Sequence, residues 1–266
     1  MSVGQLLRWS EREQLVPVPD VDGIAPAPLL AADSFLVTDG KVRGLASHRE
    51  RFFGSCPAYA VRAGQLDLFW QRAVAALPRS GRWFPRVELV GGAVPTLQLR
   101  IRPAPAPGHS IRMLRWPEPD PRKQPRRKGP DLAMLASMRQ QAVASGADEA
   151  ILTTPRGIVL EGLTTSLLWW EGDVLCAPDP HLRVLPSVTS ALLLALARQR
   201  KIRTAYRRRH IGQLDGLPVW TVNALHGIRP VVAWEGSPWP NGGTRDHAPL
   251  HDQLLDLADC CGVQHP

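Results

Sequence analysis

The sequence has no apolar run near the roughly 18 residues that a membrane-spanning helix needs. Its beginning, MSVGQLLRWSEREQ, lacks the basic-then-apolar order of a signal peptide, so we expect a cytoplasmic protein without a membrane partner. Cysteines number only four and show no CxxC spacing. We therefore expect neither a structural metal site nor a disulfide framework, and we interpret the cysteines as reduced thiols.

Lysine is also rare: of the 32 basic residues, only four are lysines. The formal net charge is +8 and the pI is near 10, which raises the question of nucleic-acid binding. The densest basic stretches, residues 122–128 and 207–209, lack the interleaved aromatic residues that stack on bases. We therefore expect no nucleic-acid partner, and a basic surface instead suits a small anionic substrate.

The first half of the chain has the pattern of an α+β domain, in which helices segregate against antiparallel strands. Residues 1–30 are rich in proline and alanine and predict an irregular segment with one short helix around Val3–Arg12. The residues beyond them predict two hairpins and two helices. These are a hairpin around Asp39–Gly40, a helix starting at Ser47, a helix over Gln65–Ala76 and a hairpin over Trp83–Arg102.

Prolines then accumulate between Pro103 and Pro130, where they exclude a central strand or a helix interior. This composition predicts an N-terminal domain over residues 1–120 and a C-terminal domain over residues 121–266. The second domain is expected to be β-rich. Its predicted elements are a helix over Asp131–Ser145, hairpins over 149–162 and 167–177, and a helix that opens at Ser187–Ser190.

Glu161 follows the apolar residues Ile158–Leu160 on a predicted strand. A buried carboxylate needs a partner, because burying an unpaired charge is costly. A protonated pyridine nitrogen would be such a partner; the alternative is a strand end at which Glu161 points to water.

The segment Ser187–Ser190 precedes an apolar helix. The N–H groups of a first helical turn bind phosphate readily, and hydroxyl groups add further donors. Ordinary N-capping by serine or threonine is the alternative.

Lys128 ends the first basic stretch. A lysine that forms a Schiff base must lose its proton readily, which partial burial and neighbouring positive charge favour. The alternative is a solvated lysine in a basic loop. The other three lysines, in a hairpin turn, a proline-rich loop and the residues after a helix, are no better placed: Lys41, Lys123 and Lys201.

In their order and spacing, these segments resemble the class IV aminotransferases of pyridoxal phosphate fold type IV. The resemblance extends over roughly residues 33–235 and includes the segment from Lys128 to Ala150, the strand of Glu161, LLWW, LPSVTS and TVNALHGIRPV. Within that family the chain is most similar to the aminodeoxychorismate lyases. The resemblance implies a smaller N-terminal α/β-sandwich-like domain and a larger C-terminal β-rich pseudo-barrel domain.

The resemblance also implies the cofactor pyridoxal 5'-phosphate and the roles of single residues. Lys128 would be the catalytic Schiff-base lysine, and Glu161 would keep the pyridine nitrogen protonated. Arg51, in the motif HRERF, would hold the phosphate. The remaining cofactor-binding residues would be Ser187, Val188, Thr189, Asn223 and Ala224.

Two positions and one short segment depart from the family pattern. Ser166 stands where the family usually has asparagine, and Ala133 stands where the branched-chain transaminases have tyrosine. Residues 31–36, AADSFL, replace a glycine-rich run. Ala133 argues against the branched-chain branch and leaves the lyase and D-amino-acid transaminase branches.

The resemblance therefore predicts a homodimeric lyase that converts 4-amino-4-deoxychorismate to 4-aminobenzoate and pyruvate in folate biosynthesis. One alternative keeps the cofactor and is an aminotransferase acting on D-amino or branched-chain amino acids. A second alternative is a non-catalytic basic binding protein on the same fold, which Ser166 and the altered N-terminal strand favour.

Overall fold

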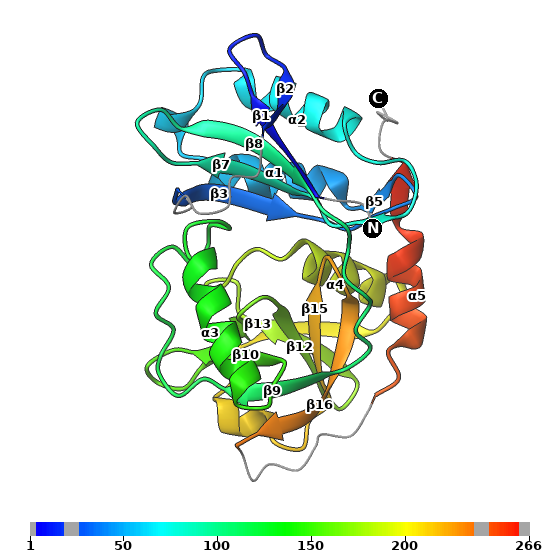
Figure 1. The fold of residues 1–266 in the computed structure, drawn as a ribbon. Helices are drawn as coiled ribbons and strands as arrows, with labels where there is room; N and C mark the ends of the chain where they lie inside the picture. The colour runs from blue at the N-terminus through cyan, green and yellow to red at the C-terminus, as the bar shows by residue number, and fades with distance from the viewer. Residues whose placement is uncertain (1–3, 19–26, 237–244, 261–266) are drawn as a thin grey trace. The chain divides into compact units, whose positions relative to one another are not determined.

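The computed structural model describes residues 4–18, 27–236 and 245–260. The chain forms two compact units (Figure 1). The first unit contains Met1–Ala106, Arg127–Pro130 and Leu257–Pro266, and the second contains Pro107–Arg126 and Asp131–Asp256. The domain boundary expected after residue 120 stays a prediction. In the structure each unit contains more than one segment of the chain, so the chain passes between the units more than once.

The first unit is built on a five-stranded antiparallel sheet in the order β2-β1-β8-β7-β3. Its strands are β1 (Gln5–Trp9), β2 (Leu15–Val18), β3 (Leu29–Ser34), β7 (Arg86–Val90) and β8 (Thr96–Ile101). Helices α1 (Leu45–Ser55) and α2 (Gln65–Ala75) cover one face of this sheet (Figure 1). Phe52 and Phe69 of these helices share a buried core with Leu99 of β8.

A smaller sheet in the order β17-β5-β4-β6 also belongs to the first unit. Its strands are β4 (Val37–Thr38), β5 (Lys41–Arg43), β6 (Arg82–Trp83) and β17 (Ala258–Cys260), and a short 3-10 helix, η1 (Ala58–Ala60), lies between α1 and α2 in the chain. The hairpin β4–β5 turns at Asp39 and Gly40, as predicted.

The second unit contains an eight-stranded mixed sheet in the order β11-β10-β9-β16-β15-β12-β13-β14. The strands are β9 (Ile111–Arg115), β10 (Glu149–Thr153), β11 (Val159–Gly162), β12 (Ser166–Glu171), β13 (Val174–Pro178), β14 (Arg203–Arg207), β15 (Val219–Asn223) and β16 (Gly227–Glu235). The edge strand β11 also contacts β12 and β13, so the sheet curls toward a barrel. The helices are α3 (Leu132–Ala144), α4 (Val188–Gln199), η2 (Ile211–Leu214) and α5 (Ala248–Asp256).

These elements confirm the predicted α+β class and most of the predicted hairpins and helices. The short helix expected around Val3–Arg12 is wrong in its described part: the chain forms β1 there, because Leu7 and Trp9 face the core in the alternating manner of a strand. Residues 1–3 and 19–26 of the predicted irregular segment lie outside the described residues. Helix α1 starts before Ser47, after Gly44, whose φ of +59° suits glycine.

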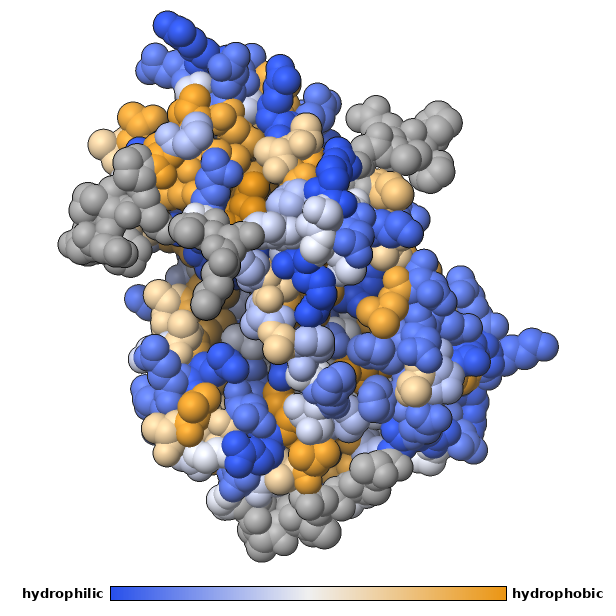
Figure 2. Space-filling view, turned by 45° about the vertical axis from the view of Figure 1, so that its right-hand side comes forward, coloured by the Kyte–Doolittle hydropathy of each residue, from blue (hydrophilic) through white to orange (hydrophobic). Residues whose placement is uncertain are grey.

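No helix within the described ranges has both the length and the apolar character of a membrane span. On the face shown in Figure 2, hydrophilic residues cover most of the second unit, whereas apolar residues gather on part of the first. The basic stretch 207–209 is paired with acids: Arg208 contacts Asp179 at 2.7 Å, and Arg209 contacts Glu171 at 2.7 Å. These pairs offset part of the positive charge that the sequence places there.

Candidate active site

The first unit holds Arg51 against a buried carboxylate. Arg51 lies on α1, and its guanidinium donates to Asp33 of β3 through Nε at 2.6 Å and Nη2 at 2.8 Å. His48, one turn earlier on α1, contacts the same carboxylate through Nδ1 at 2.8 Å. Two parallel contacts of this kind fix the plane of a guanidinium. The contacts with Asp33 therefore orient the Arg51 guanidinium.

Burial and charge oppose each other at Asp33. Burial raises the pKa of this carboxyl group, but the positive charge of Arg51 and the hydrogen bonds from Arg51 and His48 outweigh it and lower the pKa to about 2. Burial lowers the pKa of His48, and the hydrogen bond to Asp33 does not reverse that shift. At neutral pH, Asp33 is therefore ionised and His48 is neutral.

Lys128 is held at β3 of the same unit. The N–H of Ala32 donates to the Lys128 carbonyl at 2.7 Å. Gly129 approaches β3 so closely that a Cβ there would lie 2.7 Å from a backbone atom of that strand. Beyond burial, the charge of Lys128 also lowers the pKa of His48, so the two side chains are within electrostatic reach. The structure thus places the predicted Schiff-base lysine, Lys128, and the predicted phosphate ligand, Arg51, next to the same strand, β3.

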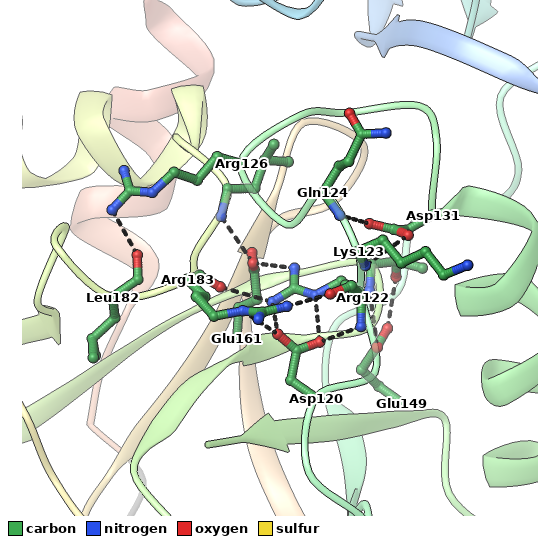
Figure 3. Close-up of polar contacts among 12 residues, drawn as sticks. Asp120, Arg122, Lys123, Gln124, Arg126, Asp131, Glu149, Glu161, Leu182 and Arg183 are labelled. Carbon is green, nitrogen blue, oxygen red and sulfur yellow. Dashed lines mark hydrogen bonds and ion pairs between the residues drawn. The ribbon is translucent and has the colours of Figure 1, made fainter. Parts of the chain in front are cut away.

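In the second unit, Glu161 is buried on β11, with 5% of its surface exposed. Its Oε1 accepts a hydrogen bond from Nη1 of Arg122 (Figure 3). It accepts another, at 2.8 Å, from the N–H of Leu185. Arg122 is a partner within the protein for this buried carboxylate, and the expected contact with a pyridine nitrogen stays a prediction. Glu161 therefore does not point to water.

Arg122 is the centre of a buried polar network. Its Nε donates to Asp120 at 2.8 Å, and its Nη2 donates to Asp120 at 3.1 Å and to the Arg183 carbonyl at 2.9 Å (Figure 3). Burial lowers the pKa of Arg122, but the charge of Glu161 and the hydrogen bonds with both carboxylates outweigh it and raise the pKa. The sequence did not single out Arg122, because it opens the basic stretch 122–128, in which only Lys128 was given a role.

Helix α4 begins where the loop that donates to Glu161 ends. Ser187 is the N-cap residue, and its Oγ accepts from the N–H of Ser190 at 3.2 Å. Val188 and Thr189 are buried, and their N–H groups belong to the first turn, which has no carbonyl partners within a helix. The second unit thus brings Glu161 and the predicted phosphate-binding turn together.

Asn223 and Ala224 lie where β15 turns into β16. The Oδ1 of Asn223 accepts from the N–H of His226 at 2.8 Å, so this side chain closes the turn. The Nδ1 of His226 accepts from the N–H of Gly108 at 3.0 Å. Because β15 contacts α4, this predicted part of the site belongs to the same unit as the helix start.

The loop between β11 and β12 is fixed by Glu149, a second buried carboxylate. Glu149 accepts hydrogen bonds from the Thr164 N–H at 3.0 Å and from the Thr164 hydroxyl at 2.6 Å. Burial raises the pKa of Glu149 although these hydrogen bonds oppose the shift. Ser166, which replaces the usual asparagine, is the first residue of β12. The loop after Glu161 is therefore held by a carboxylate contact in this chain.

Each unit contains groups whose chemistry suits pyridoxal phosphate: Arg51 and Lys128 lie in the first unit, and Glu161 and the amides that open α4 lie in the second. Arg51 and the amides that open α4 are groups that bind phosphate. Glu161 is a buried carboxylate that can face a protonated ring nitrogen, and Lys128 supplies a primary amine. Their roles toward the cofactor stay predictions.

The comparisons with known sequences give a family. A sequence model described as amino-transferase class IV matches residues 30–234. A search of the curated proteins finds no match.

Solved structures with the same fold share few identical residues with this chain. The branched-chain amino acid aminotransferase of T.th., complexed with N-(5'-phosphopyridoxyl)-L-glutamate, has a TM-score of 0.80 at 17% identity, covering 95% of this chain and 93% of that one. A hypothetical aminotransferase from Mycobacterium tuberculosis, in its PLP-bound form, has a TM-score of 0.73 at 18% identity, covering 96% and 98%. A candidate 4-amino-4-deoxychorismate lyase from Legionella pneumophila has a TM-score of 0.70 at 18% identity, covering 89% and 96%. These similarities establish the fold.

Proposed function

The chain belongs to the amino-transferase class IV family, and we propose that it is a pyridoxal-phosphate-dependent enzyme that converts 4-amino-4-deoxychorismate to 4-aminobenzoate and pyruvate. This reaction would place it in folate biosynthesis. The name of the Legionella pneumophila neighbour supports the lyase within the family, and the alanine at position 133 argues against the branched-chain branch.

The observation that carries the proposal is the link between Glu161 and the start of α4. The N–H of Leu185 donates to Glu161 at 2.8 Å, two residues before the N-cap Ser187. A phosphorylated pyridine needs a carboxylate for its ring nitrogen and an anion site at a fixed distance from that carboxylate. A hydrogen-bonded connection between the two supports a cofactor of this kind.

Each named residue has one role in the proposed reaction. When bound, pyridoxal phosphate supplies an electron sink for the substrate. Lys128 removes a ring proton from the substrate, the ether bond between the ring and the enolpyruvyl group breaks with its electron pair going to oxygen, and the released enolate takes up a proton at carbon to become pyruvate. Glu161 keeps the cofactor nitrogen protonated, while Arg51 and the amide groups that open α4 bind the phosphate. Because the product ring is aromatic, no amino acceptor is needed.

An aminotransferase acting on D-amino or branched-chain amino acids is the second candidate. The neighbour whose name states a branched-chain amino acid aminotransferase favours it. An aminotransferase needs a keto acid to accept the amino group, whereas the proposed lyase does not. The requirement for a keto acid therefore separates the two.

The test is a product assay on purified protein supplied with pyridoxal phosphate. With 4-amino-4-deoxychorismate and no keto acid, we expect equal amounts of 4-aminobenzoate and pyruvate. The Lys128→Ala variant should lose this activity, whereas Lys123→Ala, from the same basic stretch, should keep it. Amino transfer to 2-oxoglutarate or pyruvate without release of 4-aminobenzoate would overturn the lyase in favour of the aminotransferase. A protein that stays colourless with pyridoxal phosphate would instead support a non-catalytic binding protein.

A further inference from the structure

Arg122 contacts both the carboxylate of Glu161 and the loop that leads into α4. Its side chain is 4% exposed, and its guanidinium contacts Glu161, Asp120 and the Arg183 carbonyl. Arg183 donates back to the Arg122 carbonyl, so the two arginines hold each other's main chain. One side chain thus binds the strand that carries Glu161 to the loop that precedes the helix start.

The charges around Glu161 favour its ionised form. Arg122 is a cation in direct contact with it, and Arg183 adds a second positive charge to the network, 3.8 Å from Asp120. Asp120 holds Arg122 by two hydrogen bonds and so restricts how its guanidinium can turn. A buried carboxylate that receives such a contact keeps its negative charge, whereas the same carboxylate without it takes up a proton more readily.

We propose that Arg122 is a positioning residue that keeps Glu161 ionised and aimed, so that a proton shared with the cofactor resides on the ring nitrogen. This inference rests on the proposed function, because it concerns the same cofactor. Arg122 acts through Glu161 and is not proposed to touch substrate or cofactor. Without Arg122, the more basic Glu161 would hold the shared proton itself, and the ring would be a poorer electron sink.

The test reads the ring nitrogen directly. Pyridoxal phosphate labelled with 15N at the ring nitrogen is bound to the protein, and its 15N chemical shift is measured at one pH near neutrality. The unsubstituted protein should show a protonated nitrogen, and Glu161→Gln should show an unprotonated one. In Arg122→Gln the shift should move from the first value toward the second. Arg122→Lys, which keeps the charge but not the planar contacts, should lie between the unsubstituted protein and Arg122→Gln.

Arg126→Gln is the matched control. Arg126 lies four residues from Arg122 and donates to the carbonyls of Pro180 at 2.7 Å and Leu182 at 2.8 Å, in the same loop, without contacting Glu161. Its loss should leave the 15N shift unchanged, which separates an effect on Glu161 from a general loosening of the loop.

The outcomes distinguish the inference from the function on which it rests. If the unsubstituted protein binds no labelled cofactor, the proposed function fails, and the inference fails with it. If Glu161→Gln displaces the shift but Arg122→Gln does not, the proposed function stands and the inference is overturned. Should Arg122→Gln fail to fold by circular dichroism, Arg122→Lys decides, and a shift equal to that of the unsubstituted protein contradicts the inference.

Discussion

Two buried carboxylates, Asp33 and Glu161, each bind an arginine, Arg51 in the first unit and Arg122 in the second. Removing one member of such a pair leaves the other charge buried without compensation, which is strongly destabilising. A carboxylate that is 0% exposed, as Asp33 is, also cannot recover its hydration in the folded state. Substitutions at these residues should therefore change stability as well as the proposed cofactor contacts.

The first prediction concerns Asp33→Asn. At neutral pH this change should lower the free energy of unfolding by about 3–5 kcal/mol, because Arg51 loses its buried counter-charge. Urea unfolding measures the loss. As a control, Asp67→Asn removes an exposed pair with Arg49, for which we expect a change of about 1 kcal/mol or less. Equal effects of the two substitutions would contradict the account of Asp33.

The same carboxylate sets part of the dependence of stability on pH. The pKa of Asp33 is about 2 in the folded protein, below its ordinary value of 3.8. Because the folded value is the lower one, the unfolded chain binds the proton first, and the stabilisation present above pH 3.8 is lost as the pH falls toward 2. The shift corresponds to about 2 kcal/mol, which Asp33→Asn should remove from the acid limb of the unfolding curve.

At this scale the sequence could indicate Lys128, Arg51 and Glu161, because each lies in a residue pattern that the family shares. It could not indicate Arg122, which is 39 residues from Glu161 in the chain and meets it only in the folded structure. Asp33 could not be singled out for the same reason, because nothing in AADSFL shows that an arginine of a helix contacts this carboxylate. Partners in buried ion pairs are set by tertiary contacts and have no local pattern.

Among the elements, the turn at Gly129 holds Lys128 against β3. Gly129 has a φ of +139°, and an added Cβ would lie 2.7 to 2.9 Å from backbone atoms of Ala31 and Ala32. Gly146 after α3 has a φ of +90°, but an added Cβ there would meet no atom within 4 Å. A comparison of substitutions at these two positions therefore separates the cost of backbone strain from the cost of a steric clash.

The second prediction compares Gly129→Ala with Gly146→Ala. Each substitution should lower the free energy of unfolding by about 1 kcal/mol, because alanine is strained at a positive φ. Gly129→Ala should lower it by about 1–3 kcal/mol more, because the added Cβ clashes with backbone atoms. It should also weaken the binding of pyridoxal phosphate, since Lys128 must move. Thermal unfolding and cofactor titration measure the two effects. Indistinguishable variants would show that Gly129 has no special role.

The third prediction concerns the start of α4. Ser187→Ala should lower the free energy of unfolding by about 1 kcal/mol, because the N–H of Ser190 loses its cap. It should leave most of the affinity for pyridoxal phosphate, because the Ser187 hydroxyl is engaged in the cap and the main-chain amides and the Thr189 hydroxyl remain to bind the phosphate. Thr189→Ala should have the opposite effects: it should lower the affinity for pyridoxal phosphate, because the Thr189 hydroxyl is lost, and it should change the free energy of unfolding little, because the cap at Ser187 remains. A large loss of affinity in Ser187→Ala alone would contradict this assignment.

Hairpins were the elements that the sequence predicted best. The turn PRG between β10 and β11 and the turn EGD between β12 and β13 separate short apolar runs, and both pairs form as antiparallel strands. The helix start at Ser47 was wrong because Gly44, with no side chain to cap, begins α1 by adopting a left-handed conformation. The strand β1 was missed although it pairs with the nearby β2, because its other pairing partner, β8, lies about ninety residues away in the chain.

The whole molecule carries a formal net charge of +8, and the proposed substrate is a small anion. A positive field raises the rate of encounter with an anion, and salt screens it, with a Debye length of about 10 Å at 0.1 M. The fourth prediction is therefore that kcat/KM for 4-amino-4-deoxychorismate falls as ionic strength rises, while kcat changes little. A kcat/KM independent of salt would mean that acids such as Asp179 and Glu171 already neutralise the field.

The central claim is that Lys128 holds pyridoxal phosphate, and reductive labelling tests it most directly. Purified protein is incubated with the cofactor, reduced with sodium borohydride, digested and mapped by mass spectrometry. We predict a phosphopyridoxyl group on the peptide that contains Lys128, and none after Lys128→Ala. Labelling of another lysine, or no labelling at all, would contradict the account.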